Sequence, residues 1–195
     1  MARPSDAGGY PAHAILATMR RPQEVQVSGT LFLAFRQACV NLNFYVDDET
    51  RMRFQALEPA AWYPLETFTR LLHLVTERYA DPAPILEQIG IEMMRFWYEV
   101  GPGKQHIKRG VDFLHFQTSS EGYYSVIMGD ADQIGEFTLV DLNEQAGRAT
   151  VRSTTPFSKD LERGVLIGGL GLAEDLFYIR VDNSGDANTF QIEFH

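Results

Sequence analysis

The chain has 195 residues and a formal net charge of −9; 45% of its residues are hydrophobic and 22% are charged. That length fits one domain with a single core, and the composition is that of a globular protein rather than a disordered one. The negative charge argues against nucleic acid or an anionic membrane as a partner, because both require a basic face.

Cys39 is the single cysteine, which excludes an internal disulfide and a cysteine-based zinc site. No stretch approaches the ~20 apolar residues of a membrane helix, so we expect no membrane insertion. Met1–Tyr10 contains Asp6 and glycines where a signal peptide would be apolar. We therefore expect a cytoplasmic protein, with residues 1–12 as a flexible tail and residues 13–195 as a single ligand-binding-type α+β domain.

The first half of the domain is predicted to be helical. A short helix is expected at His13–Met19 and a brief extended piece at Val25–Val27. Ser28 suits the N-cap of a helix from Gly29 to about Asn43.

A charged connection is expected at Asp47–Arg53. Pro64 suits the first position of a helix over Leu65–Tyr79. The next helix, Ile85–Val100, is apolar around most of its circumference, which predicts burial on several sides.

The second half is predicted to form a sheet, because apolar and polar residues alternate in its strands. Val111–Gln117 favours a short helix or strand, and a helix is expected from Lys159 to about Asp175. The expected strands are Tyr123–Met128, Glu136–Leu142, Arg148–Ser153, Phe177–Val181 and Asn188–Phe194. The predicted fold class is α+β: a helical N-terminal half, then a mainly antiparallel four- to five-stranded sheet with one glycine-rich helix between two hairpins.

Glycines are concentrated on one face of the helix between the hairpins. Gly164, Gly168 and Gly171 follow each other at i, i+4 and i+7, and Gly169 is a fourth. A glycine inside a helix costs about 1 kcal/mol relative to alanine, so close packing against another backbone is expected to offset this cost. A phosphate-binding loop is the alternative, but neither the dinucleotide fingerprint nor a P-loop is present.

This order of elements resembles a ligand-binding superfamily shared by nitric-oxide-sensing haem domains (H-NOX-like), vinyl-reductase-type domains and TRAPP vesicle-tethering subunits. Leu86–Ile91 with Arg95-Phe96 resembles the TRAPP-type helix, and Leu166–Leu170 resembles the helix of all three branches. Thr189–Phe194 resembles the last strand. The resemblance extends over roughly residues 54–194.

Two motifs of the first half, Val27-Ser28-Gly29 and Trp62-Tyr63-Pro64, are also similar to an uncharacterised bacterial branch of this group.

The resemblance implies haem as a possible cofactor, held through a proximal histidine and a Tyr-x-Ser-x-Arg motif. Tyr123 and Ser125 match that motif, but Ile127 replaces the arginine and breaks it. Isoleucine cannot supply the bidentate anion contact that arginine makes. His115 is the candidate iron ligand; a hydrogen-bonded core or edge histidine is the alternative.

A set of methionines and aromatic residues could line an apolar cavity for a hydrophobic small molecule or a tetrapyrrole. The alternative is an aromatic core without a void. The pocket candidates are Met93, Met94, Trp97, His115, Phe116 and Tyr123.

No set of acid, base and nucleophile is apparent, so we expect a protein that is not an enzyme. The favoured hypothesis is a small-molecule-binding or sensory domain with an apolar cavity between helices and sheet. The second hypothesis is a ligand-free dimerising scaffold of the TRAPP type. A homodimer is expected because the helices at Leu31–Leu42 and Ile85–Val100 offer more apolar surface than one sheet covers.

Overall fold

A computed structural model describes residues 24–44 and 47–195. The tail expected at residues 1–12 and the helix expected at His13–Met19 lie outside the described residues. The first half contains β1 (Gln26–Ser28), α1 (Gly29–Asn41), α2 (Asp48–Gln55), β2 (Trp62–Pro64), α3 (Leu65–Thr76) and α4 (Ala83–Val100). Short elements follow: α5 (Gly103–His106), α6 (Asp112–Gln117), the 3₁₀ turn η1 (Tyr123–Ser125), β3 (Ile127–Met128) and α7 (Ala131–Ile134). The last part contains β4 (Phe137–Asn143), β5 (Arg148–Ser153), α8 (Lys159–Leu170), β6 (Ile179–Asp182) and β7 (Thr189–Phe194).

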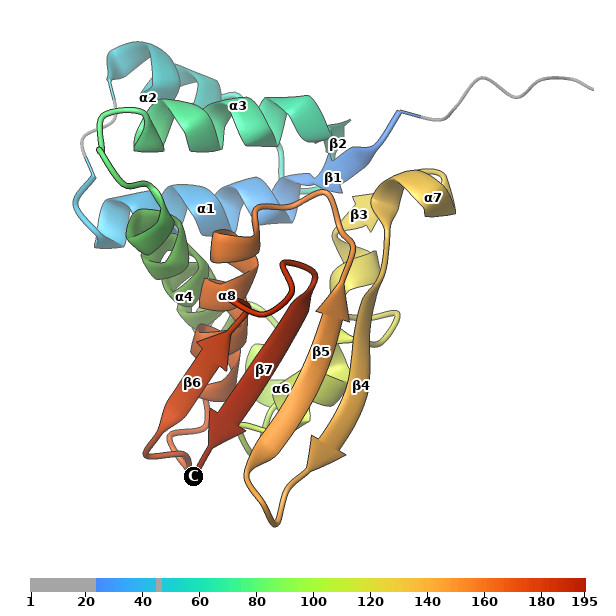
Figure 1. Cartoon of the computed structure of the whole chain (residues 1–195). Helices are drawn as coiled ribbons and strands as arrows, with labels where there is room; N and C mark the ends of the chain where they lie inside the picture. The colour runs from blue at the N-terminus through green and yellow to red at the C-terminus, as the bar shows by residue number, and fades with distance from the viewer. Residues whose placement is uncertain (1–23, 45–46) are drawn as a thin grey trace, which may run out of the picture.

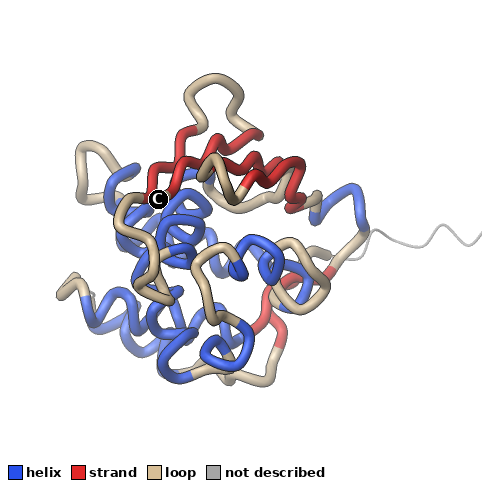
Figure 2. Tube along the Cα trace, turned by 90° about the horizontal axis from the view of Figure 1, so that it is seen from below, coloured by secondary structure: helices blue, strands red, loops and turns tan. Residues whose placement is uncertain are grey.

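The predicted α+β class is confirmed: helices come first and an antiparallel sheet comes last (Figure 1). The four strands of the main sheet run in the order β4-β5-β7-β6, and α8 connects the two hairpins. Helices cover one face of this sheet, as the view from below shows (Figure 2). The one-sided cover explains why buried and more exposed residues alternate along β7.

A second, small sheet joins the two halves of the chain. Its order is β2-β1-β3, so the three-residue β1 is central. Val27 pairs with Tyr63 on one side and with Ile127 on the other, and its side chain is fully buried. The N-terminal helices are thus fastened by hydrogen bonds to the segment that precedes the main sheet.

The packing of α8 against α4 depends on glycine. A Cβ atom added at Gly164 would lie 2.0 Å from the carbonyl oxygen of Glu87, and one added at Gly168 would lie 2.8 Å from Cα of Ile91. Gly90 faces α8 in the same way, because its Cβ would lie 2.4 Å from the carbonyl oxygen of Leu161. The two backbones therefore approach too closely for any side chain at these positions.

Gly171, the third glycine expected in this packing, has a different role. It is the C-cap of α8, and its added Cβ would meet no neighbour closer than 3.5 Å. Gly169 lies instead against the ring of Phe113 in α6, where an added Cβ would come within 2.2 Å. The crowded glycines thus face two different partners.

Two of the expected elements were wrong. Asp47–Arg53 was expected as a connection, but Asp47 caps α2 by accepting a hydrogen bond from Thr50 N at 2.8 Å. Tyr123–Met128 was expected as one strand, but Ser125 N bonds back to the carbonyl oxygen of Gly122 and forms the turn η1. Only Ile127 and Met128 of that segment pair as a strand.

Element ends also differ from the expected ones. α8 stops at Leu170 rather than near Asp175, since the chain turns at Gly171 and Glu174 has a positive φ of 56°. β6 begins at Ile179 rather than at Phe177, and the amides of Phe177 and Tyr178 both donate to the main-chain oxygen of His195. Phe177 is left 97% exposed.

None of the described helices combines the length and the apolar character needed to cross a bilayer.

Candidate functional site

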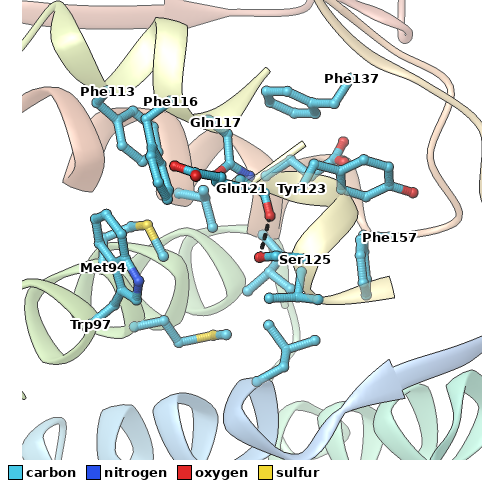
Figure 3. Close-up of a pocket in the computed structure, with 17 residues that line it drawn as sticks. Met94, Trp97, Phe113, Phe116, Gln117, Glu121, Tyr123, Ser125, Phe137 and Phe157 are labelled. Carbon is cyan, nitrogen blue, oxygen red and sulfur yellow. Dashed lines mark hydrogen bonds between the residues drawn. The ribbon is translucent and has the colours of Figure 1, made fainter. Parts of the chain in front are cut away.

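An apolar cavity of about 100 Å³ lies between α4, α6, η1 and α8 (Figure 3). Six of its lining residues are aromatic: Trp97, Phe113, Phe116, Tyr123, Phe137 and Phe157. The others are Leu31, Met93, Met94, Gln117, Glu121, Gly122, Ser125, Val126, Leu161, Glu162 and Val165. Such a lining, apolar with few polar groups, is typical of small-molecule sites.

Helical spacing explains how the walls are built. Met93, Met94 and Trp97 occupy positions i, i+1 and i+4 of α4, on one side of the helix. The Trp97 ring lies tilted against Phe116 of α6, with ring centroids 4.9 Å apart. On the opposite side Tyr123 packs edge-on against Phe157, with centroids 6.2 Å apart. The aromatic rings thus form two walls of the cavity.

Five of the six predicted pocket residues come together in this cavity, and His115 does not. His115 is exposed and is not among the lining residues. Phe113 and Phe116, three positions apart on α6, share the face that turns to the cavity. His115 lies between them in sequence but on another side of the helix, away from the pocket.

Ile127 does not lie at the cavity either. Its side chain is 2% exposed and β3 pairs it with Val27, so it is part of the core.

Glu162 is not among the residues predicted from the sequence, but it lines the cavity from α8 and is only 5% exposed. A charged residue in a helix is usually expected to face solvent. A signal was present in its position, because Glu162 precedes Val165 and Gly169 by three and seven residues and so shares their buried side.

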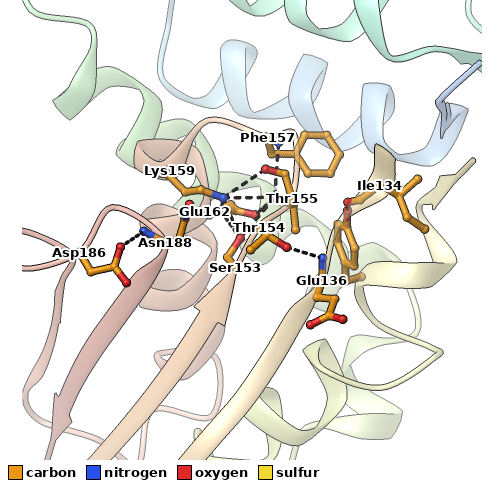
Figure 4. Close-up of polar contacts among 11 residues, drawn as sticks. Ile134, Glu136, Ser153, Thr154, Thr155, Phe157, Lys159, Glu162, Asp186 and Asn188 are labelled. Atoms are coloured by element: carbon orange, nitrogen blue, oxygen red, sulfur yellow. Dashed lines mark hydrogen bonds and ion pairs between the residues drawn. The ribbon is translucent and has the colours of Figure 1, made fainter. Parts of the chain in front are cut away.

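Glu162 is held in a polar cluster with the buried Ser153 and Thr155 and the partly buried Lys159 (Figure 4). Its Oε2 atom accepts hydrogen bonds from Ser153 Oγ at 2.7 Å and from Lys159 Nζ at 2.8 Å. Its Oε1 atom accepts one from the Thr155 hydroxyl. Burial raises the pKa of the Glu162 carboxyl, while the charge of Lys159 and these hydrogen bonds act in the opposite direction.

Tyr123 is fixed at the other end of the lining. Its hydroxyl donates a hydrogen bond to the carbonyl oxygen of Ile134. Burial, with a smaller contribution from the charge of Glu162, raises the pKa of the Tyr123 phenol, so the side chain stays neutral. Tyr123 therefore contributes an aromatic ring, and no charge, to the cavity lining.

A haem in this cavity would need an iron ligand and donors for its two carboxylates. Among the described residues that line the cavity, none is histidine, cysteine, lysine or arginine. The thioethers of Met93 and Met94 remain, but methionine ligates haem iron together with histidine. The Tyr123 phenol would have to ligate iron as a phenolate, but its pKa is raised by burial and its hydroxyl donates to Ile134. A volume of about 100 Å³ is also below the ~300–1,000 Å³ of typical ligand pockets. The residues present therefore do not fit a haem.

Elsewhere in the described part of the chain, no group of three or more His, Cys, Asp or Glu side chains could hold a metal ion.

The arrangement of helices and sheet defines the class of the protein: it has the fold of H-NOX haem domains, as the sequence resemblance predicted. The H-NOX protein from S. oneidensis in its Fe(II)NO state superposes with a TM-score of 0.63 at 10% identity, covering 86% of this chain and 99% of that chain. The unliganded Fe(II) H-NOX protein from K. algicida gives a TM-score of 0.58 at 12% identity, covering 86% and 96%.

An oxygen-binding H-NOX domain related to soluble guanylate cyclases gives 0.54 at 16% identity, covering 85% of this chain and 92% of that chain. No family model and no curated protein matches the sequence. The structural likeness establishes the fold, and the function has to be argued from this chain's own residues.

Proposed function

We propose that this chain is a non-enzymatic, cytoplasmic ligand-binding or sensory domain whose cavity binds a small hydrophobic molecule. The observation that carries the proposal is the lining itself, with six aromatic rings and two methionines around one void. A methionine side chain is flexible and polarisable, so it adapts its shape to a ligand. The H-NOX neighbours include structures with nitric oxide or oxygen bound, which supports a sensory role for this chain. Gas binding at a haem iron is not part of the proposal, because the lining does not fit a haem.

The size of the cavity limits the ligand. An engineered apolar cavity of about 150 Å³ binds benzene or xenon and otherwise stays dry. At about 100 Å³, this cavity suits a ligand no larger than one ring. Glu121 and Ser125 are the exposed part of the lining and would form the entrance.

Binding without catalysis is proposed because the hydrogen bonds made by the hydroxyls of the lining and by Glu162 are structural. Ser125 Oγ donates to the carbonyl oxygen of Gly122 at 2.7 Å, and the Tyr123 hydroxyl donates to Ile134. Glu162 accepts hydrogen bonds from its own cluster. None of these contacts is a nucleophile–base pair.

Methyl NMR of the methionines tests the proposal. On adding xenon or benzene, we expect the Met93 and Met94 methyl signals to shift while that of Met52, exposed on α2, stays. Val165→Phe fills the cavity and should abolish these shifts. Val140→Phe is the matched control, because Val140 is 60% exposed on β4. A protein that shows no shift with either probe, or shifts that persist in Val165→Phe, would refute cavity binding.

Titration with haemin separates this proposal from haem binding. We expect no Soret-type band, because the lining offers neither an imidazole nor a cation. A band that His115→Ala removes would identify His115 as the iron ligand and overturn the assignment.

The second candidate is the ligand-free dimerising scaffold of the TRAPP type. In the folded chain α4 packs between α1 and α8, so much of the apolar surface that suggested a homodimer is used internally. The homodimer stays a prediction, which sedimentation over a range of concentrations measures. A dimer together with failed probe binding would favour this candidate.

A further inference from the structure

The charges that line the cavity all have one sign. Two carboxylates, those of Glu162 and Glu121, belong to the lining, and no Lys or Arg of the described chain does. Glu162 is deeply buried, while Glu121 is exposed at the entrance. An anionic ligand would meet like charge in a poorly solvated site, where repulsion is strong.

The aromatic walls favour the opposite charge. The faces of aromatic rings carry negative electrostatic potential and attract cations placed within about 6 Å, which is how aromatic cages recognise organic ammonium ions. Trp97, the strongest ring type for this contact, lies on one wall, and Tyr123 lies on the other. The aromatic rings and the carboxylates therefore both favour a positively charged ligand.

The hydrogen bonds of Glu162 leave room for a ligand. A carboxylate has about four acceptor positions. Ser153 and Lys159 use the two on Oε2, and Thr155 uses one on Oε1. One acceptor position on Oε1 remains. Lys159 binds the carboxylate but is not a lining residue, so the cavity is lined by the anion of this pair and not by its cation.

We infer that the cavity selects a small organic ammonium ion, with its hydrocarbon part between the aromatic walls and an N–H group donating to Glu162. This inference rests on the proposed function and adds the ligand's charge to it. It also separates this chain from a haem protein, because haem presents two carboxylates to its site.

Three probes of nearly equal size test the inference on the unmodified protein: cyclopentylammonium, cyclopentanol and cyclopentanecarboxylate. Titrations followed by the Met93 and Met94 methyl signals give the affinities. Because a hydrogen bond to a charged group contributes about 1.5–3 kcal/mol, we expect cyclopentylammonium to bind at least about tenfold more tightly than cyclopentanol. Cyclopentanecarboxylate should bind most weakly.

Two variants test which carboxylate causes the preference for the ammonium ion. Glu162→Gln should reduce the ammonium-to-alcohol ratio to about one while cyclopentanol still binds. Glu121→Gln, at the exposed entrance, should lower the ratio less than Glu162→Gln does, because exposed charges are screened. If Glu162→Gln does not fold, the three-probe comparison on the unmodified chain decides alone.

The outcomes distinguish the proposal that the cavity binds a ligand from the inference that this ligand is an ammonium ion. Equal binding of the ammonium ion and the alcohol refutes the inference and leaves the proposed function standing. Failure of all three probes, like failure of xenon and benzene, refutes both. A preference that survives in Glu162→Gln, or that falls further in Glu121→Gln than in Glu162→Gln, overturns the role of Glu162.

Discussion

Lys159 and Glu162 form the most consequential pair of side chains in the molecule. Their side chains are 21% and 7% exposed, and each is also bonded to Ser153 or Thr155. Bringing two charges out of water is costly, and the pair offsets this cost only while both partners are present. Removing the cation alone leaves a buried carboxylate without its counter-charge.

Lys159→Met should therefore lower the free energy of unfolding by about 3 kcal/mol at pH 7.5, as measured by urea denaturation. Lys104→Met is the matched control: Lys104 bonds to Glu99, but both side chains are more than half exposed, so no measurable change is expected. Equal effects of the two substitutions would contradict the importance of the buried pair.

The same variant should show a defined pH dependence. Because burial raises the pKa of Glu162 above its ordinary value of 4.5, the folded chain holds a proton there that the unfolded chain has lost, so stability falls as pH rises through this interval. Without Lys159 the folded pKa rises further and the interval extends to higher pH. The deficit of Lys159→Met should thus shrink as pH falls toward and below 4.5, where Glu162 becomes protonated in the unfolded state as well.

Residue patterns predicted the cavity walls better than its polar groups. Met93, Met94 and Trp97 follow from helical spacing alone, since an apolar face must be buried somewhere. Helical spacing puts Glu162 on the buried side of α8, but whether a carboxylate is tolerated there depends on partners from β5 and the loop after it. His115 was expected at the pocket but lies outside the lining. The resemblance indicates which residue type a motif contains, but it does not indicate which side of the helix that residue faces.

The contact between α4 and α8 is the central interaction at the scale of elements. Glycines on both helices let the backbones meet, with the ion pair Arg163–Glu87 beside them at 2.5 Å. This contact holds two walls of the cavity at a fixed separation, because Met93 and Trp97 lie on one helix and Val165 on the other.

Gly164→Ala should lower the free energy of unfolding by about 3 kcal/mol, at the upper end for overpacking, because the added methyl group meets a backbone carbonyl that cannot rotate away. Gly171→Ala is the control on the same helix. Gly171 has φ −81° and open surroundings, so alanine should be neutral or stabilise by up to about 1 kcal/mol. Chemical denaturation of both variants measures the difference, and similar values for both would disprove the tight contact.

Elements with a strong apolar period were predicted well, and short polar ones were not. α1, α3 and α4 carry clear apolar faces, and β5 was predicted with its observed ends. α2 is almost entirely polar, so only its cap at Asp47 indicated a helix. The turn η1 is set by hydrogen bonds to Gly122, which no hydrophobic pattern reports.

At the scale of the whole molecule, the helical half and the sheet half are interlocked. The small sheet joins them through β1, and α4 of the first half packs against α8 of the second. Phe157, next to the cavity, also packs against Phe68 of α3, with ring centroids 5.8 Å apart. Neither half keeps a complete core without the other.

We therefore expect the two halves to unfold together as a single domain. Differential scanning calorimetry should give one transition, with a ratio of calorimetric to van't Hoff enthalpy of about one. Two resolved transitions would show that the halves are separate domains. Such a result would also place the cavity, which takes Leu31 from one half and Phe137 from the other, at a domain boundary.

The position of β1 has a consequence for biosynthesis. Its first partner strand follows soon after it, but its second, Ile127–Met128, is translated much later. While the ribosome adds the intervening residues, one edge of β1 has no partner, and exposed edges of this kind invite pairing with other chains. A nascent chain stalled before Ile127 should thus be a better chaperone substrate than the released 195-residue chain.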